Sequence, residues 1–320
     1  MKKWSRYFQN KEYLEKTRMF ILNEDMRGYI VEKIGLRPGM KVLDVGCGTG
    51  AFTYYLAEAV RDVTFTGLDF DPDFVDAAQK KIPDRKKNGC GFCFLKGDAK
   101  ELPFEPESFD IVVSHTFFNS MPQYREALRE MIRVCRQGGI IASVTAMDVD
   151  RVPYSTGIYP RDADVWKKRY DILLEKVQAM YDNIVPMQDY LGGIPTAYIP
   201  NLFEEERLKD VSAYPVGRFF SLSNKAISDE KKQRYIELGF LSDTKRLNCV
   251  YEEPEAKAFM SEEEISEFTE LLKKRRDYLT DHLKDNRIWE WEGGSNLLVT
   301  GLKPEENEIL MDAILSLVTP

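Results

Sequence analysis

One short stretch of the chain combines a carboxylate with closely spaced glycines. It spans residues 42–50, reads VLDVGCGTG, and places Asp44 two positions before Gly46. Glycines in a turn between a strand and a helix let a ligand approach the backbone closely. The spacing is GxGxG, whereas dinucleotide sites typically have GxGxxG. A carboxylate here would repel a diphosphate and attract an ammonium group, so the stretch predicts a site for an amino-acid-bearing nucleoside. A tight connection without a ligand is the alternative.

Two further acidic residues follow the next expected strands. Asp69 comes 23 residues after Gly46, and a carboxylate at that place can accept hydrogen bonds from a ribose diol. Phe70 can cover one face of an adenine. Asp98 and the backbone N–H of Ala99 can read the adenine edge. The alternative is that Asp69 and Asp98 are helix N-caps.

These residues lie at the ends of strands in an alternating pattern. Short apolar runs predict strands, and the segments between them predict amphipathic helices. The expected strands are 41–45, 63–68, 92–95, 109–114 and 140–145, and the expected helices are 51–60, 72–81 and 123–136. Such alternation implies right-handed crossovers and a mostly parallel sheet. Ligands bind at the carboxyl edge of these sheets.

This set of motifs resembles the class I S-adenosylmethionine-dependent methyltransferase family over residues 38–146. The matching segments are 42–50, 67–70, 97–99, 109–114 and 128–139. The resemblance implies an α/β fold, with a Rossmann-like, mostly parallel seven-stranded sheet and helices on both faces. It also implies transfer of a methyl group from S-adenosylmethionine to an oxygen, nitrogen or sulfur atom of a small molecule by in-line displacement, with S-adenosylhomocysteine as product.

The resemblance also implies a role for each site residue. The methionine end of the cofactor is held by Asp44, Gly46, Cys47 and Gly48, and the ribose hydroxyls by Asp69. The adenine is contacted by Phe70, Asp98 and Ala99. The floor beside the cofactor's sulfur is formed by Ser114 and His115.

His115 is the candidate catalytic residue. It follows the fourth expected strand, at the edge where ligands bind, and imidazole titrates near neutral pH. A general base is needed only if the acceptor arrives protonated and weakly acidic. The alternative is that His115 packs or forms a hydrogen bond at the end of the strand. His282 lies in a charged segment and is expected at the surface.

The cysteines and the net charge bear on partners and location. Cys90 and Cys93 form a CxxC, but zinc needs a second pair or suitably spaced histidines, so no metal is expected. Five cysteines in 320 residues fit a reducing cytoplasm. Neither a signal peptide nor a transmembrane helix is expected. The net charge of −8 does not favour nucleic-acid binding.

Four segments are expected along the chain. Residues 1–36 form a helical lid, 37–147 the cofactor-binding core, 148–295 a helical cap or substrate region with one core helix and strand, and 296–320 the last core strand and a C-terminal helix. Within these segments we expect strands at 211–221 and 296–301 and helices at 201–209, 228–238 and 261–285.

The outer segments leave several interpretations open. In the lid, Trp4, Tyr7 and Phe8 fold over the cofactor or anchor a core. Arg18 or Arg27 could pair with the cofactor's carboxylate, although surface positions are the default for arginines. The dense aromatic residues after 147 suit an apolar pocket. They suit a helical core or a homodimer interface equally well.

Three other function classes compete with small-molecule methylation. The first is methylation of a protein or an RNA, and the second is cofactor binding without catalysis. The third is an oxidoreductase on a dinucleotide fold. Binding of S-adenosylhomocysteine separates the last class from the others.

Overall fold

The computed structural model describes residues 10–85, 88–147, 156–185, 192–284 and 288–305. The chain divides into two compact units. The sheet unit comprises Leu22–Asp150, Leu191–Gly217 and Ser295–Pro320, and the helical unit comprises Met1–Ile21, Arg151–Tyr190 and Arg218–Gly294. Among the described ranges, no helix is long and apolar enough to cross a bilayer.

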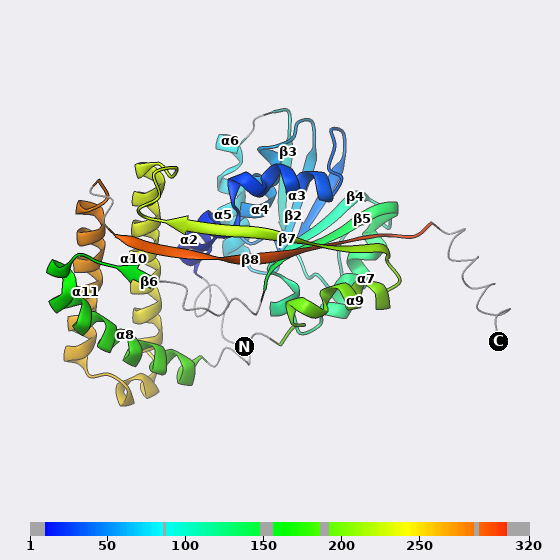
Figure 1. Cartoon of the computed structure of the whole chain (residues 1–320). Helices are drawn as coiled ribbons and strands as arrows, with labels where there is room; N and C mark the ends of the chain where they lie inside the picture. Colours follow the sequence, from blue (N-terminus) through cyan, green and yellow to red (C-terminus); the bar gives the residue numbers. More distant parts are fainter. Residues whose placement is uncertain (1–9, 86–87, 148–155, 186–191, 285–287, 306–320) are drawn as a thin grey trace. The chain divides into compact units, whose positions relative to one another are not determined.

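Five parallel strands form the centre of the sheet unit (Figure 1). They are β1 (Lys41–Val45), β2 (Thr64–Asp69), β3 (Gly91–Lys96), β4 (Phe109–His115) and β5 (Cys135–Ala146). Their order is β3-β2-β1-β4-β5. Asp44 lies opposite Gly67 on β2 and Val113 on β4, so the glycine-rich turn leaves the sheet between its central strands.

Two long strands complete this sheet. β8 (Trp289–Leu302) runs antiparallel to β5, with Val299 opposite Ser143, and β7 (Lys209–Ser221) pairs with β8. These seven strands confirm the predicted mostly parallel sheet. An eighth described strand, β6 (Thr156–Ile158), pairs with the first residues of β8 within the helical unit.

Helices cover both faces of the sheet, as predicted. Neighbouring residues of β1 alternate between the two faces: Val42 packs in one hydrophobic cluster and Leu43 in another. The Val42 cluster includes α3 (Arg27–Lys33) and α4 (Ala51–Ala57), and the Leu43 cluster includes α7 (Tyr124–Val134) and α9 (Ile199–Glu205). Near-continuous burial along β1 is typical of a parallel strand buried on both faces.

Some predicted boundaries need correction. The helix expected at 123–136 ends at Val134, because Cys135 already pairs with Phe109 in the sheet. Pairing within the tertiary structure therefore overrides the local helical pattern. The helix expected at 201–209 spans Ile199–Glu205. Most of the predicted C-terminal helix lies outside the described residues.

The helical unit is built from four main helices. They are α2 (Lys11–Ile21), α8 (Asp164–Ile184), α10 (Asp229–Tyr251) and α11 (Glu262–Asp281). Apolar residues of α8, α10 and α11 form one cluster, and residues of α2, α10 and α11 form a second. The helix predicted at 228–238 corresponds to α10, which is longer than predicted and ends at Tyr251. The role of this unit as a cap stays a prediction.

The predicted N-terminal helical segment is divided between the two units. α2 belongs to the helical unit and α3 to the sheet unit, and η1 (Glu24–Met26) lies between them. Asn23 accepts a hydrogen bond from the N–H of Asp25, which ends the continuous helix. The predicted lid residues Trp4, Tyr7 and Phe8 lie outside the described residues.

Candidate functional site

The glycine-rich stretch forms the turn between β1 and α4. Gly46 and Gly48 have φ values of 71° and 55°, in the region that favours glycine. The N–H groups of Gly46 and Cys47 donate to the carbonyl oxygen of Leu68 at 2.8 and 3.0 Å. A Cβ atom at Gly46 would lie 2.4 Å from Cδ2 of Phe117. The turn is therefore tied to the end of β2 and closely covered by the segment after β4.

Asp69 is bound directly to this turn. Its Oδ2 accepts the N–H of Gly48 at 2.8 Å, and its Oδ1 accepts the N–H of Asp71 at 2.9 Å. Burial raises the pKa of the Asp69 carboxyl to about 6, while the two backbone N–H groups act in the opposite direction. Each oxygen keeps a further lone pair that can accept a hydrogen bond from a ribose hydroxyl.

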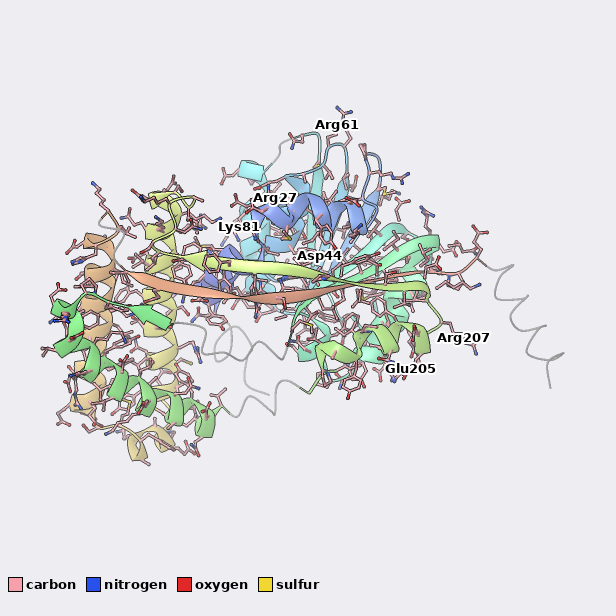
Figure 2. All side chains as sticks on the ribbon, in the orientation of Figure 1. Arg27, Asp44, Arg61, Lys81, Glu205 and Arg207 are labelled. Atoms are coloured by element: carbon pink, nitrogen blue, oxygen red, sulfur yellow. The ribbon has the colours of Figure 1, made fainter. Side chains whose placement is uncertain are left out.

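Asp44 lies in the interior of the sheet unit (Figure 2). Its side chain is 0% exposed, and its Oδ2 accepts a hydrogen bond from Oγ1 of Thr53 at 2.6 Å. Lys81, also labelled in Figure 2, donates from Nζ to the carbonyl oxygen of Thr49 at 3.2 Å. A side chain of α4 thus binds the strand before the turn, and the residue directly after α5 (Pro72–Lys80) binds the turn itself.

The predicted adenine-binding residues follow β2 and β3. Phe70 is 71% exposed, and Nζ of Lys96 lies 6.0 Å from its ring centroid. Asp98 accepts the N–H of Lys100 at 2.9 Å, and Ala99 is buried. An exposed ring directly after Asp69 offers an apolar face next to the carboxylate.

Ser114 and His115 are the last two residues of β4, and both are buried. His115 is 6% exposed and stacks on Phe52 of α4, with ring centroids 5.1 Å apart. Its Nδ1 lies 3.0 Å from Oγ1 of Thr116, a β-branched residue with a φ of 51°. Ser114 lies opposite Val45 of β1 and is 0% exposed. His115 therefore packs against α4, and its role as a base stays a prediction.

Two arginines that were candidates for the cofactor's carboxylate have partners of their own. Arg27 forms an ion pair with Glu58 at 2.7 Å. Arg18 belongs to the helical unit and donates to Thr17 at 3.0 Å. Within the described part of the chain, no group of three or more His, Cys, Asp or Glu side chains could hold a metal ion.

The structure brings the turn, Asp69 and the end of β4 together and adds residues that the sequence did not predict. Thr53 binds Asp44, and Phe117 covers Gly46. A threonine on the inward side of a helix looks like an ordinary core residue, so the local pattern did not mark Thr53 as part of the site. The positive-φ turn and the acceptor oxygens of Asp69 fit the amino-acid and ribose parts of S-adenosylmethionine.

Comparisons with known proteins agree with this geometry. Residues 43–143 match the family described as "Methyltransferase domain". A demethylmenaquinone methyltransferase from Bacillus pumilus is 29% identical over 215 residues, which cover 66% of this chain and 89% of that protein. Another from Staphylococcus aureus is 37% identical over 141 residues, 42% of this chain and 57% of that protein. The match thus spans little more than half of the second relative.

A solved structure adds one further likeness. The phosphoethanolamine N-methyltransferase 2 of Haemonchus contortus, in complex with phosphomonomethylethanolamine and S-adenosylhomocysteine, is 15% identical with a TM-score of 0.49. The alignment covers 94% of this chain and 60% of that one. The matched domain of the present chain contains the turn, Asp69 and β1 to β5 almost completely. Residues 43–143 therefore carry a methyltransferase domain, in keeping with the resemblance to the class I S-adenosylmethionine-dependent methyltransferases.

Proposed function

We propose that the sheet unit binds S-adenosylmethionine across the turn after β1 and catalyses transfer of the cofactor's methyl group to a small-molecule acceptor. The hydrogen bond from the Gly48 N–H to Asp69 carries this proposal, because it joins the two parts of the predicted site in one rigid arrangement. The methionine end lies along Asp44, Gly46, Cys47 and Gly48. Asp69 accepts from the ribose, Phe70, Asp98 and Ala99 surround the adenine, and Ser114 lies near the sulfur.

The chemistry requires alignment more than acid–base groups. When bound, S-adenosylmethionine supplies a methyl carbon whose bond to sulfur breaks as the acceptor's lone pair forms the new bond, and the electron pair returns to sulfur. The chain's residues hold the cofactor in line and exclude water, which removes a large entropic barrier. The acceptor's proton leaves to a base or to water.

His115 stays a candidate base, but its surroundings favour a supporting role. The imidazole stacks on Phe52, and its Nδ1 contacts Thr116. A general base must reach the acceptor's proton within hydrogen-bonding distance or through one water. A ring buried to this degree would have to leave its stack to do so. We therefore propose that His115 supports α4 beneath the turn.

The relatives indicate which acceptor to test first. Two of them are named as demethylmenaquinone methyltransferases, so a demethylmenaquinone is the first candidate acceptor. Since the Staphylococcus aureus match covers only 57% of that protein, the quinone is a proposal for this chain. Small O-, N- and S-acceptors are the next compounds to test.

Two experiments test the proposal. Calorimetry should show binding of S-adenosylhomocysteine and no binding of NADH, and an Asp69→Asn variant should bind the former at least tenfold more weakly. Methyl-labelled S-adenosylmethionine should then label material in a small-molecule extract. If the label appears only in precipitated protein or RNA, the acceptor class is wrong. If S-adenosylhomocysteine does not bind and no acceptor is labelled, the cofactor assignment is wrong.

We also propose a cytoplasmic enzyme that works without nucleic acid or membrane, with a homodimer as the expected assembly. All five cysteines carry free thiols, in keeping with a reducing compartment. Sedimentation equilibrium tests the dimer, and a purely monomeric species over the micromolar range contradicts it.

A further inference from the structure

The first observation concerns a buried hydrogen bond beneath the cofactor turn. Oγ1 of Thr53 donates to Oδ2 of Asp44 at 2.6 Å, and both side chains are 0% exposed. Asp44 is the fourth residue of β1, and Thr53 lies in the first turn of α4. The bond therefore joins the strand and the helix on the two sides of the glycine-rich turn.

The second observation concerns what surrounds Thr53. Its neighbours on α4 are apolar: Phe52 and Leu56 belong to one hydrophobic cluster, and Tyr54 belongs to another. Valine has nearly the shape of threonine and would suit such surroundings, but it lacks the hydroxyl. A buried carboxylate is expensive unless hydrogen-bond donors compensate it. The hydroxyl of Thr53 therefore stabilises the Asp44 carboxylate, beyond what the shape of the side chain contributes to packing.

We propose that Thr53 is a positioning residue of the cofactor site, which orients the Asp44 carboxylate toward the ammonium group of S-adenosylmethionine. The inference rests on the proposed role of Asp44. Thr53 does not touch the ligand. Its hydroxyl holds one carboxylate oxygen, and this fixes the plane of the whole group at the base of the turn.

The test compares two ligands that differ only at the amino-acid end. S-adenosylhomocysteine carries the ammonium group, whereas 5′-methylthioadenosine keeps the adenosine and the thioether but has a methyl group in place of the amino-acid chain. We expect Thr53→Val to weaken S-adenosylhomocysteine binding about tenfold, the usual effect of losing a hydrogen bond to a charged group. Its affinity for 5′-methylthioadenosine should stay within twofold of wild type.

Matched variants separate positioning from folding. Thr53→Ser keeps the hydroxyl and should restore S-adenosylhomocysteine affinity, whereas Thr53→Ala should behave like Thr53→Val. In an Asp44→Asn background, Thr53→Val should have little further effect on that affinity, because the group on which Thr53 acts is already neutral. If Thr53→Val does not fold, the serine and alanine variants give the same comparison.

Each result decides the question. Equal loss for both ligands would mean that Thr53 only staples α4 to β1, and no loss for either would mean that its hydroxyl has no role in binding. An additive effect with Asp44→Asn would also overturn the inference. Failure of the wild-type protein to bind S-adenosylhomocysteine would instead overturn the proposed function, so the two failures are distinguishable.

Discussion

Replacing Asp69 by asparagine should make the ligand-free sheet unit more stable at neutral pH and less able to bind cofactor. Burial raises the pKa of this carboxyl from 3.8 to about 6. The folded protein therefore holds a proton that the unfolded chain has released between about pH 4 and pH 6, so stability falls as the pH rises through that window. The difference between the folded and unfolded pKa values of Asp69 corresponds to at most about 3 kcal/mol.

The asparagine side chain changes this balance in two ways. It cannot ionise, so the penalty of about 3 kcal/mol disappears above pH 6. Its amide group accepts only one of the two N–H bonds from Gly48 and Asp71, which costs about 1 kcal/mol. Asp69→Asn should therefore be about 2 kcal/mol more stable than wild type at pH 8 and about 0.5 kcal/mol less stable at pH 4.

The readout must come from the sheet unit. Tryptophans 166, 289 and 291 belong to the helical unit, so their fluorescence reports on that unit. We suggest urea unfolding at pH 4 and pH 8, followed by pulsed hydrogen exchange of peptides covering 41–69. Asp76→Asn, at an exposed position of α5, is the control. A stability difference that is the same at both pH values would refute the reasoning.

Three further changes test other parts of the molecule. Gly46→Ala should lower S-adenosylhomocysteine affinity at least tenfold in calorimetry, because its Cβ would lie 2.4 Å from Phe117; unchanged affinity would contradict the fit of the turn. Arg275→Met leaves the buried carboxylate of Glu290 without its cation, so tryptophan fluorescence should show a loss of about 3–5 kcal/mol, and a wild-type midpoint would count against this. His115→Ala should lower stability by about 1–3 kcal/mol yet keep kcat within threefold, whereas a hundredfold drop in kcat would support a base.

The sequence pattern predicted the sheet unit well, because the residues that mark its strands and its site are neighbours in the sequence. Strand ends, glycine spacing and acidic residues all occur within a few positions of one another, and a parallel sheet places consecutive strand ends at one edge. Asp69 reaches Gly48 for this reason. His115 shares a face of β4 with Ile111 and Val113, on the side of Phe52. A strand that is buried on both faces gives no local pattern from which that side could be predicted.

The helical unit could not be derived in this way, because its packing joins distant parts of the chain. α2 packs with α10, more than 200 positions later, and Asn10 donates to the carbonyl oxygen of Ser242 at 3.2 Å. Periodicity predicts that such helices exist but not which of them pack together. The pairing of α2 with α10 was therefore not predictable, and the role of residues 1–36 as a lid stays a prediction.

β8 contributes residues to both units, because the boundary between them falls at Gly294. Within the helical unit, Glu290 and Glu292 are buried; Glu290 is held by Arg275 and Tyr159, and Glu292 by Lys16 and Tyr235. Within the sheet unit, Leu298 and Val299 enter opposite hydrophobic clusters. A slip of one residue would turn both carboxylates away from their partners, and breaking one buried pair costs about 3–5 kcal/mol. These ion pairs therefore fix the register of β8, a restraint that the two-sided apolar pattern at 297–299 cannot supply.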